Sequence, residues 1–191
     1  MTKYIILAIL LIPFVNLAQN NLEWEDGYQL TVDDYLAKAP NTGTMQTVSG
    51  SFYVAYEMGG INLLTNRNLN SYVSCYFQKD ASYIDDGDET STKRLLRYQQ
   101  LIFNLYELQA RKLRQKFFEE RTRLLTKGAG SLYNEVAAEH ARLVSEIEGG
   151  TNHGYSSDET TEWLEWTDQE LKKLADYCKE CKPQKKKRKN N

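Results

Sequence analysis

The stretch that decides the fold is Leu95-Leu96-Arg97-Tyr98-Gln99-Gln100-Leu101-Ile102-Phe103-Asn104, which opens the most strongly periodic part of the chain. Apolar residues recur there and beyond at steps of three, four or five positions, which is the spacing of one face of an α-helix. This stripe comprises Leu95, Tyr98, Ile102, Leu105, Leu108 and Leu113. We therefore expect a long helix from Ser91 to about Lys127, capped by Thr90, Ser91 or Thr92 and ended by Gly128-Ala129-Gly130.

Two further helices are predicted after this one. Residues 131–148 place Leu132, Val136, Ala137, Leu143 and Ile147 inward, and Gly149-Gly150 follows them. Residues 158–177 form the second, in which Trp163 and Trp166 stand three positions apart. That spacing is typical of a helical packing face, so we interpret these aromatic rings as core rather than as a sugar-binding platform.

The first half of the chain is predicted to form strands. Residues 47–58 and 70–77 alternate aromatic or β-branched residues with others, as strands on a half-buried sheet do. Strands that precede helices indicate a segregated α+β fold rather than an alternating parallel one. The predicted fold class is α+β, with a small N-terminal antiparallel or mixed sheet, then a long helix and two further helices.

Residues 1–18 have the layout of a secretory signal peptide. Lys3 precedes an apolar run from Tyr4 to Val15, and the small residue Ala18 marks the predicted cleavage edge. As a membrane anchor the run is too short, because about 20 apolar residues are needed to span a bilayer. We expect an exported protein, periplasmic or secreted and not an integral membrane protein, whose single domain covers residues 19–181.

Charge is distributed unevenly along this exported chain. Residues 19–181 hold 17 basic and 26 acidic side chains, whereas residues 182–191 hold six basic and no acidic ones. An acidic body argues against a nucleic-acid-binding protein. The basic tail is interpreted as a disordered, solubilising end, or as a segment that contacts an anionic surface.

The cysteines suit an oxidising compartment. Cys178 and Cys181 can close a small disulfide, and Cys75 alternates with aromatic residues in a predicted strand, which indicates a buried position. A redox motif would need a βαβ unit beside Cys178 and Cys181, and the sequence predicts none.

Several short motifs, in order, make much of the chain resemble a family of secreted bacterial proteins predicted to be zinc-dependent proteases. The matching pieces are Leu30-Thr31-Val32-Asp33-Asp34-Tyr35 with Pro40, Thr47-Val48-Ser49-Gly50, Cys75-Tyr76-Phe77 with Ser82-Tyr83-Ile84, Phe103, Glu107-Leu108, Ala110-Arg111-Lys112-Leu113, and Thr151-Asn152-His153-Gly154. The resemblance implies a zincin-like fold, in which a helix of the sheet-and-helix core carries the zinc ligands. In such proteins this helix reads His-Glu-x-x-His-Phe-Asp.

Here the corresponding positions are Tyr98, Gln99 and Ile102, followed by Asn104. Ile102 has no donor atom, the Gln99 amide cannot accept a proton as a base, and Tyr98 could bind a metal only as a phenolate, since its ordinary pKa is about 10. The family's zinc is therefore not expected in this chain. The sequence predicts a pseudopeptidase without catalytic residues, whose former cleft binds a peptide or protein partner.

Three residues could remain of the family's cleft. The resemblance implies that His153 corresponds to a third metal ligand, and Glu107 is the candidate to orient it or to supply an oxygen ligand. The simpler interpretation is that Thr151 and His153 hydrogen-bond to fix a loop between helices, because zinc normally has three or four protein ligands. The alternative function is an active metallohydrolase with a rearranged site around His153, Glu107 and Tyr98.

Overall fold

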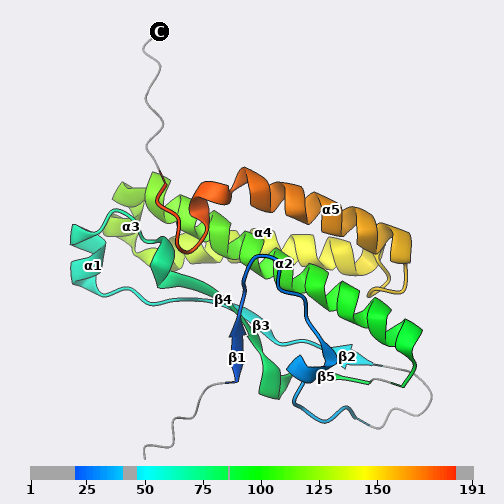
Figure 1. Ribbon diagram of the computed structural model, residues 1–191. Coiled ribbons are helices and arrows are strands. Elements are labelled where there is room, and N and C mark those ends of the chain that lie inside the picture. The colour runs from blue at the N-terminus through cyan, green and yellow to red at the C-terminus, as the bar shows by residue number, and fades with distance from the viewer. Residues whose placement is uncertain (1–19, 41–46, 86, 184–191) are drawn as a thin grey trace, which may run out of the picture.

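The structure is a computed structural model that describes residues 20–40, 47–85 and 87–183. The predicted signal peptide, residues 1–18, and residues 184–191 of the basic tail lie outside these ranges. Within them the protein is α+β, with a small antiparallel sheet and mostly helices, so this part of the fold prediction is confirmed (Figure 1). No described helix combines the length and apolarity needed to cross a bilayer.

The strands form two antiparallel sheets, one of three strands and one of two. β4 (Val73–Gln78) lies between β1 (Asn21–Glu23) and β3 (Phe52–Tyr56), with Val54 opposite Cys75. β2 (Val48–Ser49) pairs with β5 (Tyr83–Ile84). β3 and β2 stand at the outer edge of their groups in the pairing order.

The two predicted strands are shorter than expected. The segment 47–58 divides into β2 and β3, because the Ser51 N–H donates to the Ser82 hydroxyl (2.8 Å) instead of to a strand carbonyl. In the segment 70–77, residues Asn70–Tyr72 form a 3₁₀ turn before β4 begins at Val73. A short helix, α1 (Gly60–Thr65), joins β3 to this turn.

The long helix is α2 (Glu89–Glu119), and it differs from the prediction at both ends. Its cap is Asp88, whose carboxylate accepts hydrogen bonds from the N–H groups of Thr90 and Ser91, so none of the three predicted residues is the cap. At Glu120 the helix breaks, and α3 (Arg121–Lys127) follows in a new direction. Leu124 of α3 is buried in the same core cluster as Phe117 of α2.

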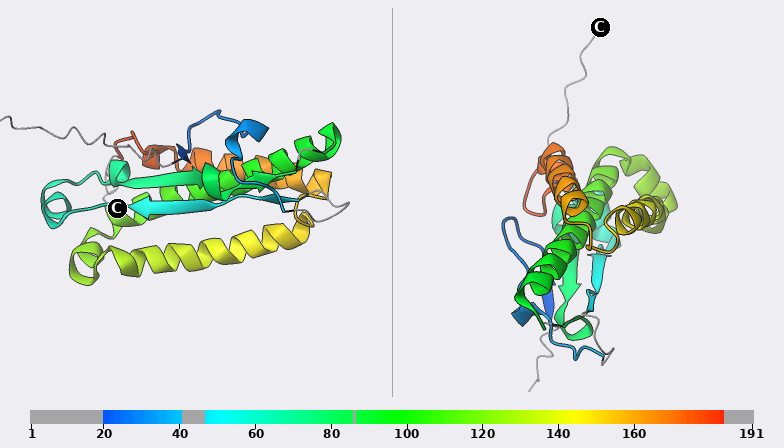
Figure 2. Two further views of the ribbon diagram at one scale, coloured as in Figure 1. Left: turned by 90° about the horizontal axis from the view of Figure 1, so that it is seen from below. Right: turned by 90° about the vertical axis from the view of Figure 1, so that its right-hand side faces the viewer.

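The remaining helices pack on α2. α4 (Ala129–Gly150) and α5 (Ser157–Lys173) replace the predicted 131–148 and 158–177, and the C-terminal turn Ala175–Tyr177 is 3₁₀ rather than helical. Viewed along the helices, α4 and α5 pack on two different sides of α2, which also contacts β3 and β4 (Figure 2). Because two layers cover α2, every residue of its predicted stripe is buried, and so are several polar residues: Gln99, Gln100, Glu107, Gln109, Arg111 and Arg114.

Candidate functional site

A pocket of about 410 Å³ lies beside the first half of α2, where β2 and the turn between α4 and α5 meet the helix. It contains Tyr98, Gln99 and Ile102, the positions that the resemblance aligns with a metal motif, together with His153. Its lining residues are Thr47, Val48, Ser49, Gly50, Phe52, Leu95, Tyr98, Gln99, Ile102, Glu148, His153 and Tyr155. We refer to this pocket as the cleft.

The turn that presents His153 is held by Thr151. The Thr151 hydroxyl donates to the Ile147 carbonyl (2.7 Å) and accepts from the Gly154 N–H (3.4 Å). Asn152 and His153 both have positive φ angles, 48° and 53°, in the left-handed region that non-glycine residues seldom occupy. Such strain costs on the order of 1 kcal/mol per residue, and it is concentrated at functional sites in proteins.

The prediction for this loop is correct only in part. Thr151 fixes the turn through its side chain, but His153 does so through its backbone N–H, which donates to the Glu148 carbonyl (3.0 Å). Its imidazole forms no hydrogen bond with a described residue and is exposed at the cleft. His153 is therefore free to contact a ligand.

Tyr98 and Ile102 form the apolar wall of the cleft on α2. Each is less than a tenth exposed. Burial, with a smaller contribution from the Glu148 carboxylate, raises the pKa of Tyr98 to about 12. The phenolate that metal coordination would require is thus even less accessible than in an isolated tyrosine.

Gln99 supplies a buried polar group to the same wall. Its carbonyl oxygen Oε1 is buried and finds no donor among the described residues. A Cβ atom at Gly50 would overlap this amide, so β2 approaches the helix closely only because residue 50 is glycine. A buried oxygen without a hydrogen-bond donor destabilises the folded state by about 1–3 kcal/mol. Such a group is more readily retained at a binding site than in an ordinary core.

The donor set of the cleft does not fit a zinc ion. Ile102 has no ligand atom, Gln99 is neutral, and His153 and Glu148 are two groups where zinc normally takes three or four. Across residues 20–40, 47–85 and 87–183, no three His, Cys, Asp or Glu side chains gather in a way that could hold a metal ion.

The structure places Glu107 and His153 on the walls of two different pockets, which does not support the alternative in which the two cooperate. Glu107 follows Ile102 by five residues, so the two side chains point about 140° apart around the helix axis. Its Oε1 accepts from Arg111 Nε (3.0 Å) and Arg114 Nη1 (2.7 Å) in a buried network. The rearranged hydrolase site around His153, Glu107 and Tyr98 is therefore not assembled.

This network lies at the base of a second, larger pocket of about 580 Å³. Arg114 also donates to the carbonyls of Val73 and Tyr177, so it ties β4 to the C-terminal segment. Cys178 and Cys181 form a disulfide at its rim, and the buried thiol of Cys75 lies on its wall. Burial raises the pKa of that thiol, which keeps it protonated and unreactive.

Glu148 and Tyr155 are among the cleft residues that sequence reasoning missed. Tyr155 follows the His-Gly pair and stacks under the Arg94 guanidinium, 4.1 Å from the ring centre. Both lie close in sequence to the Thr151–Gly154 motif. That closeness to His153 was the signal in the sequence that could have identified them. Comparison of the chain with protein-family models, curated proteins and solved structures finds no match.

Proposed function

We propose that this protein is an exported, catalytically inactive relative of zinc-dependent proteases that binds an extended peptide segment in the cleft. One observation supports this most: three positions matching the family's metal motif and the histidine of its later motif line one pocket, although 51 residues separate Ile102 from His153. If the resemblance were due to chance, there would be no reason for these four residues to line the same pocket.

The edge of β2 offers the backbone groups that an extended peptide needs. Asp85 N–H donates to the Thr47 carbonyl (2.8 Å), which makes Thr47 and Asp85 a hydrogen-bonded pair. By the alternation of antiparallel strands, Val48 directs its N–H and C=O away from β5. No described residue bonds these groups, and Val48 lines the cleft, so a peptide could add there as a further strand.

The side chains of the cleft suit binding rather than hydrolysis. Phe52, Leu95 and Ile102 offer apolar contact for a peptide side chain, and the Gln99 amide and His153 imidazole offer hydrogen bonds. Hydrolysis by the family's mechanism needs a metal-bound water and a basic carboxylate, and Gln99 stands in place of that carboxylate. A bound peptide would thus stay intact.

Selection from a phage-displayed library of random dodecapeptides tests this proposal. The selected peptide, labelled with fluorescein, is titrated with the protein processed at Ala18, and mass spectrometry follows its integrity. We expect binding without cleavage. N-methylation at alternate peptide residues should weaken binding at least tenfold, and methylation at the intervening residues should not, because only alternate N–H groups point to the β2 edge.

Gln99→Met provides the matched protein variant. It keeps the shape of the side chain but removes the unpaired amide, so folding should be unharmed or favoured while peptide affinity falls. Equal sensitivity to methylation at every peptide position, or chelator-sensitive cleavage of the peptide, would rule out the proposed mode. Export itself is checked by N-terminal sequencing of the protein recovered outside the cytoplasm, with Gln19 as the expected first residue.

A further inference from the structure

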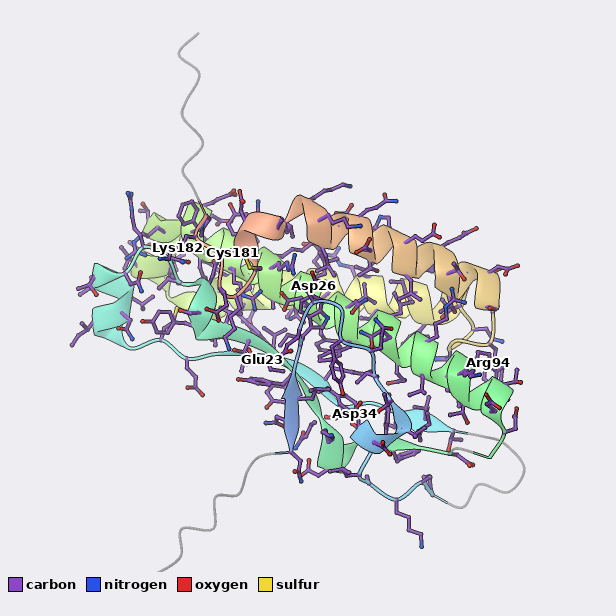
Figure 3. The ribbon with its side chains drawn as sticks, in the orientation of Figure 1. Glu23, Asp26, Asp34, Arg94, Cys181 and Lys182 are labelled. Atoms are coloured by element: carbon purple, nitrogen blue, oxygen red, sulfur yellow. A yellow bond between two sulfur atoms is a disulfide. The ribbon has the colours of Figure 1, made fainter. Side chains whose placement is uncertain are left out.

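The larger pocket of about 580 Å³, which we call the second pocket, brings together the two ends of the described chain. Residues 23–26 and residues of the C-terminal segment 175–181 line it together with buried side chains of α2. It shares no lining residue with the cleft. Glu23, Asp26 and Cys181 lie apart from Arg94, which stacks on the cleft residue Tyr155 at the far end of α2 (Figure 3). The second pocket is therefore a separate place for a ligand.

The part of the lining that belongs to α2 holds an excess of positive charge. Arg111, Arg114 and Glu107 are 7%, 1% and 3% exposed. Both guanidinium groups bond to the same carboxylate oxygen, Glu107 Oε1. Two buried positive charges thus share one negative charge. Because a buried charge is unfavourable unless it is paired, a further negative group in the pocket would stabilise this arrangement.

Arg111 has hydrogen-bonding capacity left for such a group. Its Nε donates to Glu107 (3.0 Å) and its Nη1 to the Leu171 carbonyl (2.8 Å), whereas its Nη2 has no acceptor among the described residues. By contrast, all three nitrogens of Arg114 donate to described residues. A guanidinium with an uncommitted N–H group is a preferred partner of a carboxylate. Arg111 is therefore the group that can receive a carboxylate in this pocket.

The exposed part of the same lining has the opposite charge. Its carboxylates that form no ion pair with a described residue are those of Glu25, Asp26 and Glu180. Lys179, which also lines the pocket, pairs with Glu23. Lys172, whose charge acts on Asp26, pairs with Asp168 at 2.5 Å. We call these three carboxylates the acidic rim, and they favour a cationic group near the entrance.

The remaining lining is apolar and held in place. The Trp24 indole N–H donates to the Asn104 side chain (3.0 Å), and the Arg111 guanidinium lies over the Trp24 ring, 5.4 Å from its centre. Cys75 and the Cys178–Cys181 disulfide add further apolar surface. Pockets for small ligands usually measure about 300–1,000 Å³ and combine apolar walls with a few polar groups. The second pocket has this character.

We propose that the second pocket binds a small zwitterion of amino-acid type, a free amino acid or a dipeptide with apolar side chains. Its carboxylate bonds to Arg111 and offsets the buried positive charge, and its ammonium group lies at the acidic rim. The apolar side chain packs on Trp24. A simple anion would meet the acidic rim, and a simple cation would meet the guanidinium groups, so only a ligand with both charges matches the whole lining. This inference does not require that the cleft bind a peptide.

Isothermal titration calorimetry tests the proposal with the protein processed at Ala18. The probes are leucine and the dipeptide Leu-Leu, and the tighter of the two shows which size of zwitterion the pocket takes. N-acetyl-Leu-Leu lacks the ammonium charge, and Leu-Leu amide lacks the carboxylate. We expect each blocked form to bind at least tenfold more weakly than Leu-Leu, because each loses one charged partner. No binding of either probe, or equal binding of the blocked forms, would overturn the proposal.

Two variants assign each charge of the ligand to its site. Arg111→Gln leaves Arg114 and Glu107 as a one-to-one pair, so the protein should remain folded, which circular dichroism verifies. It should lower the affinity for Leu-Leu at least tenfold without further weakening Leu-Leu amide. Glu25→Gln/Asp26→Asn changes only exposed side chains and should weaken Leu-Leu but not N-acetyl-Leu-Leu. A general loss of structure would instead lower the affinity for blocked and unblocked dipeptides alike.

Two controls separate the second pocket from other surfaces. Glu165→Gln removes an exposed carboxylate of α5 that does not line the pocket, and its binding of Leu-Leu should equal that of the unchanged protein. Gln99→Met alters the cleft and should also leave Leu-Leu binding unchanged. Loss of Leu-Leu binding in Gln99→Met would place the dipeptide in the cleft and overturn the proposal. If Arg111→Gln does not fold, the rim variant and the blocked dipeptides still decide the outcome.

Discussion

Gly154 lies directly against Tyr98. A Cβ atom at Gly154 would come within 2.5 Å of the Tyr98 Cβ, and the φ angle of Gly154 is +86°. The turn after α4 is thus closed onto α2 at the residue next to His153, with no room for a side chain. This contact sets the distance between His153 and the helix wall of the cleft.

Gly154→Ala should lower the free energy of unfolding by about 2–4 kcal/mol, since the new methyl meets an atom fixed to the α2 backbone and the φ angle disfavours L-residues. Urea titration measures this. Gly149→Ala is the control, because nothing lies within 4 Å of a Cβ there. It should stabilise the helix by about 0.5–1 kcal/mol. Equal effects of the two changes would contradict the close contact.

Glu107→Gln should destabilise the protein by about 3–5 kcal/mol. The change leaves the buried guanidinium groups of Arg111 and Arg114 without their counter-charge, and Arg114 is only 1% exposed. Glu139→Gln removes the exposed ion pair with Lys112 and should cost less than about 1 kcal/mol. The denaturant midpoints of the two variants, at an unchanged m-value, give the two changes in unfolding free energy. A small effect of Glu107→Gln would show that the network is solvated.

His140 should make the protein less stable in mild acid. The imidazole packs on the Tyr106 ring (4.4 Å between centres), and its buried Nε2 has no hydrogen-bond partner among the described residues. Lys112 and Glu139 lie close by. Burial and then the Lys112 charge lower its pKa to about 4. Between pH 6.5 and 4 the unfolded chain binds the proton that the folded one does not, so stability falls as pH falls.

His140→Gln should remove about 2 kcal/mol of this decline between pH 6.5 and 4. Thermal melts across that range measure the difference between variant and unchanged protein. Carboxylates contribute equally to both proteins and cancel in the comparison. Parallel stability curves from pH 7 to 4 would mean that His140 is protonated in the fold.

Rebuilding the family motif tests the alignment of α2 with His153. The triple variant Tyr98→His/Gln99→Glu/Ile102→His should bind zinc in a competition titration with a chromophoric chelator, because two imidazoles four residues apart face the cleft. Adding His153→Ala to the triple variant should lower its affinity for zinc at least tenfold. Asn134→His/Ala138→His places the same spacing on the exposed face of α4 and controls for a two-histidine site.

No loss of zinc affinity on adding His153→Ala would contradict the correspondence between His153 and the third family ligand. It would also remove the main support for the inactive-protease interpretation. The peptide-binding experiment does not depend on this result.

Much of the cleft could be anticipated because its parts are short motifs. Tyr98, Gln99 and Ile102 were identified by their place in one helix, and His153 by its own four-residue motif. Glu107 was misjudged, since being near in sequence to Ile102 does not put it on the same face. The break at Glu120 was also missed, because the apolar pattern continues through it from Phe117 to Leu124.

The sequence by itself determined the long helix, its apolar stripe and the segregated α+β order, because these follow from periodicity over a few neighbouring residues. It also determined that Ile102 cannot bind a metal, because its side chain has no donor atom. Only the tertiary structure decided that Gln99 and Glu107 are both buried beside different pockets, and that His153 lines the pocket of Gln99. The reason is that a second layer of helices covers the polar face of α2, and such contacts join residues far apart in the chain.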